Sequence, residues 1–474
     1  MRSITFFAIT LVVASVSVFA QSNPVPLIYQ PLKPAHISPG HAEFALAVHG
    51  TGFVPGAVVR WNGRNLKTEF RSKSLVIALV PSQAVVKAST GSVTVVNPGG
   101  IASNVLYLPI RRSASTVTVI TDPSVIEGGE VVLGDFNNDH RPDIAVVQNN
   151  VSTGTATADI YLNGGSGRFT KVSGPQTFGP VLLQGNAVGD VNNDGNLDTT
   201  VCTSSGGPDQ SCSIYLGDGH GGLTSTNFGV PAVGALADVN GDGILDYVTV
   251  SSDCCGFYFS VYLGNGDGSF SFVVASFVQL NSSFPGWGLP VVGDFNGDGK
   301  LDVAVPGRGH TVPGPGPVAV FLGNGDGTFQ SEVDYQVPWF GVFAAVADVN
   351  GDGKLDIVNN GTAVLLGNGD GTFTVGSSFN LNNSAANVQI EDLNGDGQLD
   401  LAATTVSNDG SQTLNILLGN GDGTFQNPIT FAAGVGSGDM GIADFNNDGL
   451  LDFAIGGSLD GSSASTVLLQ SAAK

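Results

Sequence analysis

DFNGDGKLD, at residues 294–302, is one of seven copies of the pattern Asp-x-Asn-x-Asp-x-x-x-Asp. The other copies begin at residues 135, 190, 238, 348, 392 and 444, so neighbouring copies start 44 to 56 residues apart. A Gly-rich motif such as FLGNGDGTF, at residues 321–329, follows each of the first six copies. Recurrence at this period indicates a chain built from one repeated structural unit.

Each repeat contains four short apolar runs separated by Gly-rich turns. In the fourth repeat, LPVVGD leads into the Asp loop and DVAVPG follows it; a third run then enters GNGDG and a fourth begins at Phe329. Four short strands in about 50 residues are typical of a β-propeller blade, and no repeat has the 3.6-residue period of a helical solenoid. We therefore expect an all-β fold in which residues 113–474 form a seven-bladed β-propeller.

Closure of the ring can also be predicted. The seventh repeat ends shortly after residues 467–470 and lacks a fourth strand. Residues 115–121, STVTVIT, precede the first loop and alternate as a strand does. We expect this segment to complete the seventh blade, which removes the open edge of the ring.

The repeats resemble the FG-GAP/VCBS family, whose blades are shared with the heads of integrin α-chains. The resemblance covers residues 113–474. It implies a propeller fold and a binding or adhesion role, and it does not specify a ligand.

The Asp loops carry the oxygen donors that a hard cation requires. Positions 1, 3, 5 and 9 supply carboxylate or amide oxygens, position 7 adds a backbone carbonyl, and Gly at position 6 permits a left-handed turn. All-oxygen ligation favours calcium over zinc or copper, so we predict up to seven Ca²⁺ ions. The predicted ligands are Asp135, Asn137, Asp139, Asp143, Asp190, Asn192, Asp194, Asp198, Asp238, Asn240, Asp242, Asp246, Asp294, Asn296, Asp298, Asp302, Asp348, Asn350, Asp352, Asp356, Asp392, Asn394, Asp396, Asp400, Asp444, Asn446, Asp448 and Asp452.

The first loop departs from this pattern. His140 replaces Gly at position 6 and Pro142 occupies position 8. Because His enters the left-handed region less readily than Gly, we expect the first site to be weak or empty. The alternative for every loop is a metal-free Asn/Gly/Asp turn, which seven copies in phase disfavour.

Residues 24–110 lack Asp loops and read as short strands between Gly, Pro and Asn turns, which predicts a small β-sandwich. The string VHGTGFVPGAVVRWNG at residues 48–63, followed by VTVVNPGG at residues 93–100, is similar to IPT/TIG domains, which have an immunoglobulin-like fold. Trp61 fits the core of the sandwich better than a sugar site. Residues 111–113 form a short hinge.

The N-terminal residues of the chain indicate export. Residues 1–20 have a single early Arg, an apolar run and a Val-Phe-Ala end, which predicts a signal peptide cleaved near Ala20; no later stretch of the mature chain is expected to span a membrane. The chain is acidic: Asp and Glu number 40 against 17 Lys and Arg, a net charge of −23, which argues against nucleic-acid binding.

We expect a Cys202–Cys212 disulfide across a turn, while the pairing of Cys254 and Cys255 stays open.

The ring face opposite the Asp loops carries the connections that vary most between repeats, and we expect recognition there. Candidate ligand-binding residues are Phe284, Trp287, Arg308, His310, Trp339 and Phe340. No catalytic set is evident, so we predict a non-catalytic, secreted binding or adhesion protein for an extracellular glycan or protein. The alternative is a polysaccharide-active hydrolase or lyase, for which Glu332 and Asp334 are the spare acids.

Overall fold

The structure is a computed structural model, and it describes residues 23–121, 126–150, 155–172, 176–178, 187–204, 210–231, 234–253, 256–273, 278–279, 286–308, 316–338, 341–360, 363–379, 381, 385–436, 438–457 and 464–471. The expected signal peptide, residues 1–20, lies outside this part. Apart from the 3₁₀ turn η1 (Ser82–Val85), every regular element in these ranges is a β-strand. The expectation of an all-β chain is therefore confirmed. None of these ranges contains a helix that is long and apolar enough to cross a membrane.

Residues 23–110, here called the N-terminal module, contain two four-stranded sheets with the orders β1-β2-β6-β5 and β4-β3-β7-β8. Their strands are β1 (Leu27–Ile28), β2 (Phe44–Thr51), β3 (Val58–Trp61), β4 (Arg64–Asn65), β5 (Lys67–Ser72), β6 (Leu75–Val80), β7 (Ser89–Val96) and β8 (Leu106–Ile110). Burial alternates along β6, as it does when one face of a sheet covers a core. Trp61 is 5% exposed and belongs to the core that both sheets share, as the sequence favours.

Seven further sheets follow in the described residues, each with four strands on its main path. The first contains β10 (Glu130–Gly134), β11 (Asp143–Asn150), β12 (Thr155–Asn163), β13 (Phe169–Val172) and β14 (Gln176–Phe178). The second contains β15 (Val188–Gly189), β16 (Asp198–Ser204), β17 (Gln210–Gly217) and β18 (Leu223–Pro231). The third contains β19 (Gly234–Ala237), β20 (Asp246–Asp253), β21 (Gly256–Gly264), β22 (Phe270–Phe272) and β23 (Val278–Gln279). The fourth contains β24 (Gly286–Trp287), β25 (Val291–Gly293), β26 (Asp302–Arg308), β27 (Gly316–Phe321) and β28 (Val333–Val337). The last three contain β29 (Ala344–Ala347), β30 (Asp356–Asn359), β31 (Ala363–Gly367) and β32 (Phe373–Ser378); β33 (Ala385–Glu391), β34 (Asp400–Val406), β35 (Ser411–Leu417) and β36 (Ile429–Val435); and β37 (Met440–Ala443), β38 (Asp452–Ile455), β39 (Thr466–Ser471) and β9 (Thr118–Thr121).

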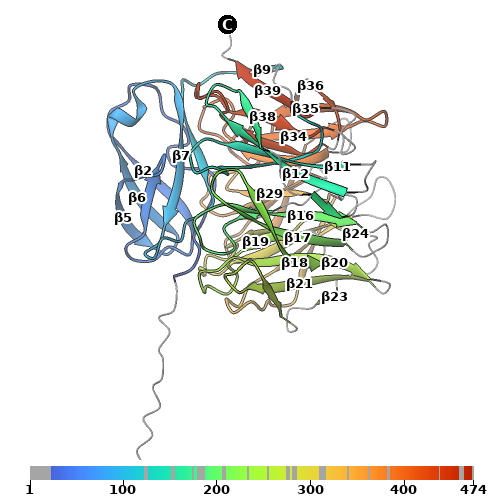
Figure 1. The fold of residues 1–474 in the computed structure, drawn as a ribbon. Coiled ribbons are helices and arrows are strands. Elements are labelled where there is room, and N and C mark those ends of the chain that lie inside the picture. The colour runs from blue at the N-terminus through green and yellow to red at the C-terminus, as the bar shows by residue number, and fades with distance from the viewer. Residues whose placement is uncertain are drawn as a thin grey trace, which may run out of the picture.

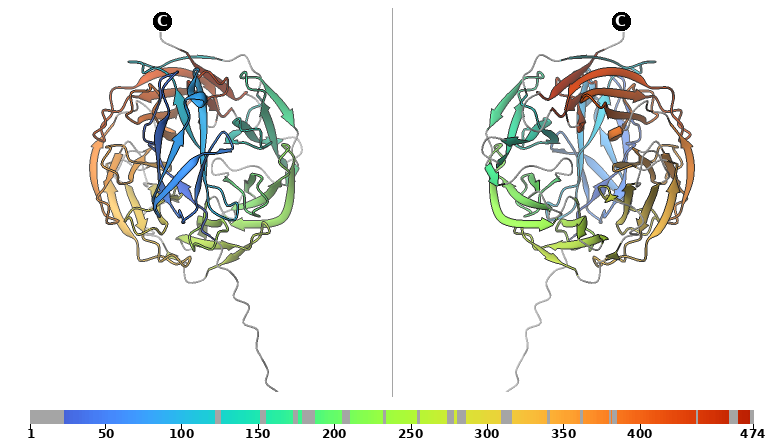
Figure 2. Two further views of the ribbon diagram at one scale, coloured as in Figure 1. Left: turned by 90° about the vertical axis from the view of Figure 1, so that its left-hand side faces the viewer. Right: turned by 90° about the vertical axis from the view of Figure 1, so that its right-hand side faces the viewer.

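These seven sheets stand side by side around a common centre, which is a propeller-like arrangement (Figure 2). Neighbouring sheets pack face to face: Phe259 of β21 stacks on Phe321 of β27, with ring centroids 4.3 Å apart. All six residues of β27 are buried, because it lies in the middle of its sheet and is covered on both faces. This explains why the inner strands read as continuous apolar runs whereas the outer strand β28 is largely exposed.

The last sheet contains strands from both ends of the ring. β9 pairs antiparallel with β39, so that Thr118 lies opposite Ser471 and Thr121 opposite Leu468. The Thr118 hydroxyl also donates to the Ser471 carbonyl at 2.8 Å. The segment before the first Asp loop therefore supplies the fourth strand of the sheet that the seventh repeat begins.

The N-terminal module covers one face of the ring and leaves the other face free of it (Figures 1 and 2). Leu27 and Tyr29 of the module pack against apolar clusters between neighbouring sheets of the ring. The Tyr29 hydroxyl also accepts the backbone N–H of Asp294 at 3.1 Å. The module thus makes both apolar and polar contacts with the ring.

Candidate metal centres

The Asp loops lie on the ring face that the N-terminal module covers. Each loop joins the first and second strands of a sheet, as residues 294–302 join β25 to β26, and the Gly-rich turn joins the third strand to the fourth. Alternate connections in an antiparallel sheet fall at the same end of the strands. Hydrogen bonds such as that from Thr51 Oγ1 to Asp294 Oδ2, 3.2 Å long, place this end against the module.

The last aspartate of each of the first six loops is a buried link between the two recurrent motifs. Asp302 Oδ2 accepts the backbone N–H of Phe295, and Asp302 Oδ1 accepts that of Gly323 in the Gly-rich turn, both at 2.8 Å. Gly323 is required there, because a Cβ would lie 2.1 Å from the Leu301 carbonyl oxygen. Equivalent pairs of bonds are made by Asp143, Asp198, Asp246, Asp356 and Asp400. In the seventh loop, Asp452 accepts the amides of Phe445 and of Gln470 on β39.

The acids of one loop also repel one another. Burial is the main cause that raises the pKa of Asp302 to about 7, and the negative charges of Asp294 and Asp298 raise it further. These three residues hold positions 9, 1 and 5 of the fourth loop. A cation among them would favour their ionised forms and remove this repulsion.

Positions 1 and 3 turn their side-chain oxygens toward a shared backbone amide, that of position 5. In the third loop, Asp242 N donates to Asp238 Oδ1 at 3.1 Å and to Asn240 Oδ1 at 2.8 Å. Gly243 adopts a φ of 86°, which lets its N–H reach Asp238 Oδ2 at 2.9 Å. Carboxylate and amide oxygens therefore gather within one tight turn, and these are the donors that Ca²⁺ prefers.

In the fifth loop, one carboxylate oxygen lacks a hydrogen-bond donor. Asp348 is 7% exposed, and its Oδ1 atom is buried without a partner among the described residues. An unpaired buried carboxylate oxygen is costly unless a donor or a cation faces it. The donor set at positions 1, 3 and 5 thus fits a hard cation.

The aspartate at position 9 is a less direct cation ligand, because its oxygens already accept hydrogen bonds from backbone amides and only their remaining lone pairs are free. In the ranges that the structure describes, no group of three or more His, Cys, Asp or Glu residues is assembled as a metal cluster. The carboxylates of a loop are therefore close in sequence and in space, but they are not drawn together around one point.

The sequence matches the FG-GAP-like repeat family over residues 135–201, 238–305, 311–358 and 392–455, just over half of the chain. This chain belongs to the FG-GAP-like repeat family. Three of the four matched stretches begin at the first aspartate of an Asp loop, and together the four stretches contain all seven loops. No curated protein sequence is significantly similar to the chain.

Solved structures that align with most of this chain have low sequence identity to it and low TM-scores. An auxiliary nutrient-binding protein from Bacteroides ovatus is 11% identical with a TM-score of 0.38, covering 95% of this chain and 100% of its own. A second auxiliary nutrient-binding protein, from Bacteroides thetaiotaomicron, is 11% identical with a TM-score of 0.35, covering 94% and 98%. A fungal alcohol oxidase in complex with copper is 12% identical with a TM-score of 0.34, covering 93% and 92%. These values carry no information on ligand or activity.

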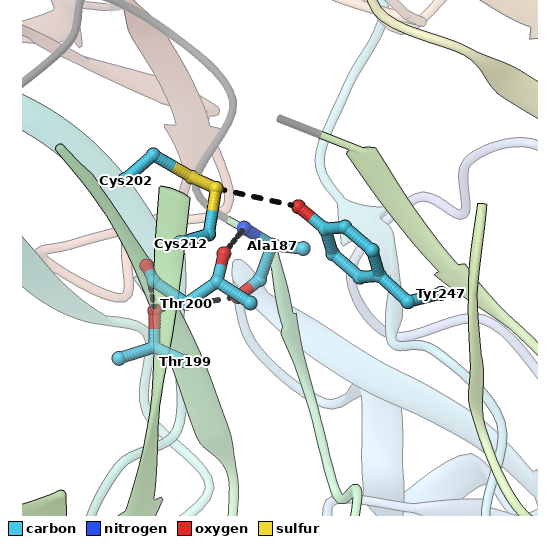
Figure 3. The surroundings of a disulfide bond; sticks show 6 residues. All are labelled: Ala187, Thr199, Thr200, Cys202, Cys212 and Tyr247. Atoms are coloured by element: carbon cyan, nitrogen blue, oxygen red, sulfur yellow. Dashed lines mark hydrogen bonds between the residues drawn. A yellow bond between two sulfur atoms is a disulfide. The ribbon is translucent and has the colours of Figure 1, made fainter. Parts of the chain in front are cut away.

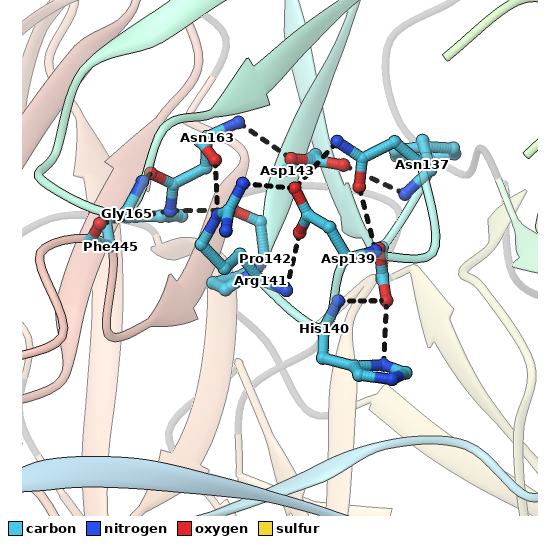
Figure 4. A network of polar contacts seen from close by, with 11 residues as sticks. Asn137, Asp139, His140, Arg141, Pro142, Asp143, Asn163, Gly165 and Phe445 are labelled. Carbon is cyan, nitrogen blue, oxygen red and sulfur yellow. Dashed lines mark hydrogen bonds and ion pairs between the residues drawn. The ribbon is translucent and has the colours of Figure 1, made fainter. Parts of the chain in front are cut away.

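The first FG-GAP-like loop contains two basic residues, Arg141 and His140, that contact its aspartates (Figure 4). Arg141 Nη2 donates to Asp139 Oδ2, and Arg141 Nε donates to the Asn163 carbonyl oxygen at 2.7 Å. His140 Nδ1 lies 3.5 Å from Asp135 Oδ2. His140 does adopt a left-handed φ of 65°, so this residue does not prevent the turn. The larger departure is Arg141, whose side chain the repeat pattern gave no reason to single out.

Most of the candidate ligand-binding residues lie beyond the described part of the chain. Phe284, His310, Trp339 and Phe340 fall in its gaps. Trp287 and Arg308 belong to the adjacent strands β24 and β26, where Gly286 is the partner of Arg308. Their role in binding stays a prediction.

The two spare acids do not form an opposed pair. Asp334 lies on the outer strand β28, and Glu332 directly precedes that strand. Residues two apart on an extended chain project to the same side, so these carboxyl groups do not face each other across a groove. Burial, and secondarily the charge of Glu332, raise the pKa of Asp334. Glycosidases instead place two carboxyl groups on either side of the scissile bond.

A disulfide joins Cys202 of β16 to Cys212 of β17, with an S–S distance of 2.05 Å (Figure 3). The two residues are direct partners in the antiparallel register. Tyr247 of β20, in the next sheet, directs its hydroxyl at Cys212 Sγ over 3.7 Å. Cys254 and Cys255 lie outside the described residues.

Proposed function

We propose that this chain is a secreted, calcium-stabilised, seven-bladed β-propeller that binds an extracellular glycan or protein without catalysing a reaction. The signal-peptide pattern of residues 1–20 supports export, and the seven in-phase repeats support seven blades. The two-sheet core of residues 23–110 supports an IPT/TIG-like, immunoglobulin-like module. The observation that carries the proposal is the position of this module on the Asp-loop face, because it leaves the opposite face open to a partner (Figure 2).

Calcium would be held by the Asp, Asn and Asp side chains at positions 1, 3 and 5 of each loop, with the Asp at position 9 contributing its remaining lone pairs. Bound Ca²⁺ supplies positive charge that offsets the crowded carboxylates and fixes the turn. In this proposal its role is structural, since the loops face the N-terminal module. All seven loops carry the donor pattern, but the first loop binds weakly or not at all because Arg141 already donates a hydrogen bond to Asp139. The position 7 lysines of the fourth and fifth loops, Lys300 and Lys354, lie farther from their aspartates, at 3.9 Å and 3.4 Å.

The first loop should gain a calcium ion when its pattern is restored. In the double variant His140→Gly/Arg141→Asn, the first loop carries the position 6 and 7 residues of the second loop, Gly195 and Asn196. We expect calcium bound per chain, measured by equilibrium dialysis with elemental analysis, to rise by one. The matched control Arg168→Asn removes an arginine outside the loop and should leave the stoichiometry unchanged. An unchanged value in the double variant would show that Arg141 does not limit binding.

The predicted binding role of Trp339 can be tested by substitution. Buried aromatic anchors commonly dominate recognition energy, so Trp339→Ala is expected to weaken binding by about tenfold or more. The measurement is affinity for whichever glycan or polysaccharide an array in millimolar calcium identifies. Phe272→Ala removes a ring that is 44% exposed on the outer strand β22 and serves as the control. Loss of folding in Trp339→Ala would instead make Trp339 a core residue, and a blank array with folded protein would favour a protein partner.

A further inference from the structure

The N-terminal module contacts the first aspartate of five consecutive Asp loops, the third to the seventh. The contacting groups come from separate parts of the module, yet all five meet the same carboxylate oxygen, Oδ2. Three contacts are hydrogen bonds: Val25 N to Asp238 (2.8 Å), Thr51 Oγ1 to Asp294 (3.2 Å) and Thr90 Oγ1 to Asp444 (2.7 Å). The other two are longer polar contacts, Lys33 Nζ to Asp348 (3.6 Å) and His36 Nδ1 to Asp392 (3.5 Å). The module therefore contacts the same loop position, position 1, in five successive loops around the ring.

The two oxygens of these aspartates have different surroundings. In the seventh loop, Asp444 Oδ2 accepts both Thr90 Oγ1 and the position 6 amide of Gly449, the latter at 2.8 Å. Asp444 Oδ1 instead accepts the amide of Asp448, at position 5 within the loop, at 3.1 Å. Asp238 and Asp294 divide their oxygens in the same way. Oδ2 thus faces the module while Oδ1 faces the loop, where a cation would lie.

Contact with the module buries this acidic surface. Asp238, Asp348, Asp392 and Asp444 are only 3% to 7% exposed. By comparison, the side chain of Asp135 in the first loop, outside these five contacts, is 20% exposed. Burying carboxylates is costly unless positive charge compensates them.

The positive charge of the chain at this interface is limited. Arg111, which follows the module, is 3% exposed and lies near Asp392, Asp396, Asp400 and Asp448, four acids for one guanidinium. The guanidinium has no hydrogen-bond partner among the described residues. Lys33, which lies near Asp348, is 44% exposed, so solvent screens it. Arg64, Arg141 and Lys354 line the cavities between the module and the ring. The positive charge of the chain therefore compensates the buried first aspartates only in part.

Packing between the module and the ring is incomplete. Cavities of about 580 Å³, 310 Å³ and 360 Å³ lie between them, and each is lined by residues of both parts. The largest lies between β3–β4 of the module and the first and seventh loops. Because continuous apolar packing is absent there, the polar contacts to the loop aspartates carry a large share of the docking.

We propose that the Asp-loop face is a calcium-dependent docking surface for the chain's own N-terminal module. The first aspartates of the third to seventh loops have two partners: Oδ1 would bind the cation, and Oδ2 contacts the module. Calcium favours docking because it compensates the buried carboxylates. By reciprocity, docking tightens calcium binding at these loops, because the module's donors hold each carboxylate in place. The inference rests on the proposed calcium sites.

Two measurements on the full mature chain test this coupling. First, hydrogen exchange of the peptide containing residues 23–36 is compared in millimolar calcium and in EDTA, below the melting temperature in both. We expect exchange of this peptide to rise by about tenfold or more in EDTA, while the buried strand β6 inside the module is unchanged. Second, calorimetric calcium titration is compared for the wild type and the double variant Thr51→Val/Thr90→Val. We expect two sites to weaken by at least about fivefold.

Thr372→Val is the matched control, since it removes a hydroxyl that bonds an exposed carboxylate, Asp370 at 2.6 Å, which is not part of an Asp loop. It should leave every calcium site unchanged. If the wild type binds calcium but the double variant titrates like Thr372→Val and residues 23–36 exchange equally in EDTA, the coupling is wrong while the metal assignment stands. If the wild type binds no calcium, the proposed sites fail together with the coupling. A double variant that melts well below the wild type in EDTA is replaced by the single variant Thr90→Val.

Discussion

Removal of calcium with EDTA is expected to lower the melting temperature by roughly 10 °C or more. A site whose free calcium stands at 1,000 times its dissociation constant stabilises the folded state by about 4 kcal/mol. We expect six of the seven FG-GAP-like loops to bind calcium, and 1 kcal/mol shifts the melting temperature of a domain of 150–250 residues by about 2–4 °C. Even two or three occupied sites therefore produce a large shift. Differential scanning calorimetry of the mature chain measures it.

The control separates calcium loss from other effects of the chelator. EDTA that has been saturated with calcium beforehand should leave the melting curve in place, and added calcium should restore it. Magnesium should restore it poorly, because Mg²⁺ demands rigid octahedral geometry and holds its water more tightly. A melting curve that EDTA does not move would overturn the calcium assignment for all loops, whatever the ring face binds.

The strand pattern could be predicted because each strand has a local signal. The alternation in residues 115–121 marks a strand, and the missing fourth strand of the seventh repeat shows where it belongs; β9 and β39 are paired in the structure. The inner strands could be placed because burial on both faces demands continuous apolar runs, as in β27. Recurrence of the two motifs also placed their turns at the same end of each sheet.

The roles of individual acids could not be read from the pattern. Position 9 has the same residue type as positions 1 and 5, but Asp302 faces two backbone amides that are 7 and 21 residues away. The Arg141 contact with Asp139 depends on a side-chain direction that a repeat pattern does not specify. Docking of Thr51 and Thr90 onto loop aspartates more than 240 residues away is a tertiary contact without any local signal.

Asp302→Ala is expected to destabilise the ring by about 2–6 kcal/mol, even in EDTA. The substitution leaves the backbone N–H groups of Phe295 and Gly323 without their acceptor, and each unpaired buried donor costs roughly 1–3 kcal/mol. Asp302 is 0% exposed, so water does not readily replace the lost oxygens. Thermal and denaturant unfolding of the variant and the wild type in EDTA measure this structural part alone.

Comparison with a neighbouring acid shows whether position 9 is special. Asp334→Ala removes a carboxylate from the same sheet, on the exposed strand β28, and should change stability by less than about 1 kcal/mol. The same pair of variants in millimolar calcium adds the contribution of the metal site. If Asp302→Ala matches the wild type in EDTA and differs only in calcium, Asp302 acts as a ligand and the amide bonds contribute little. If it is destabilised in both, the position 9 aspartates of the first six loops hold the two turns of each sheet together, which accounts for the joint recurrence of the Asp loop and the Gly-rich motif.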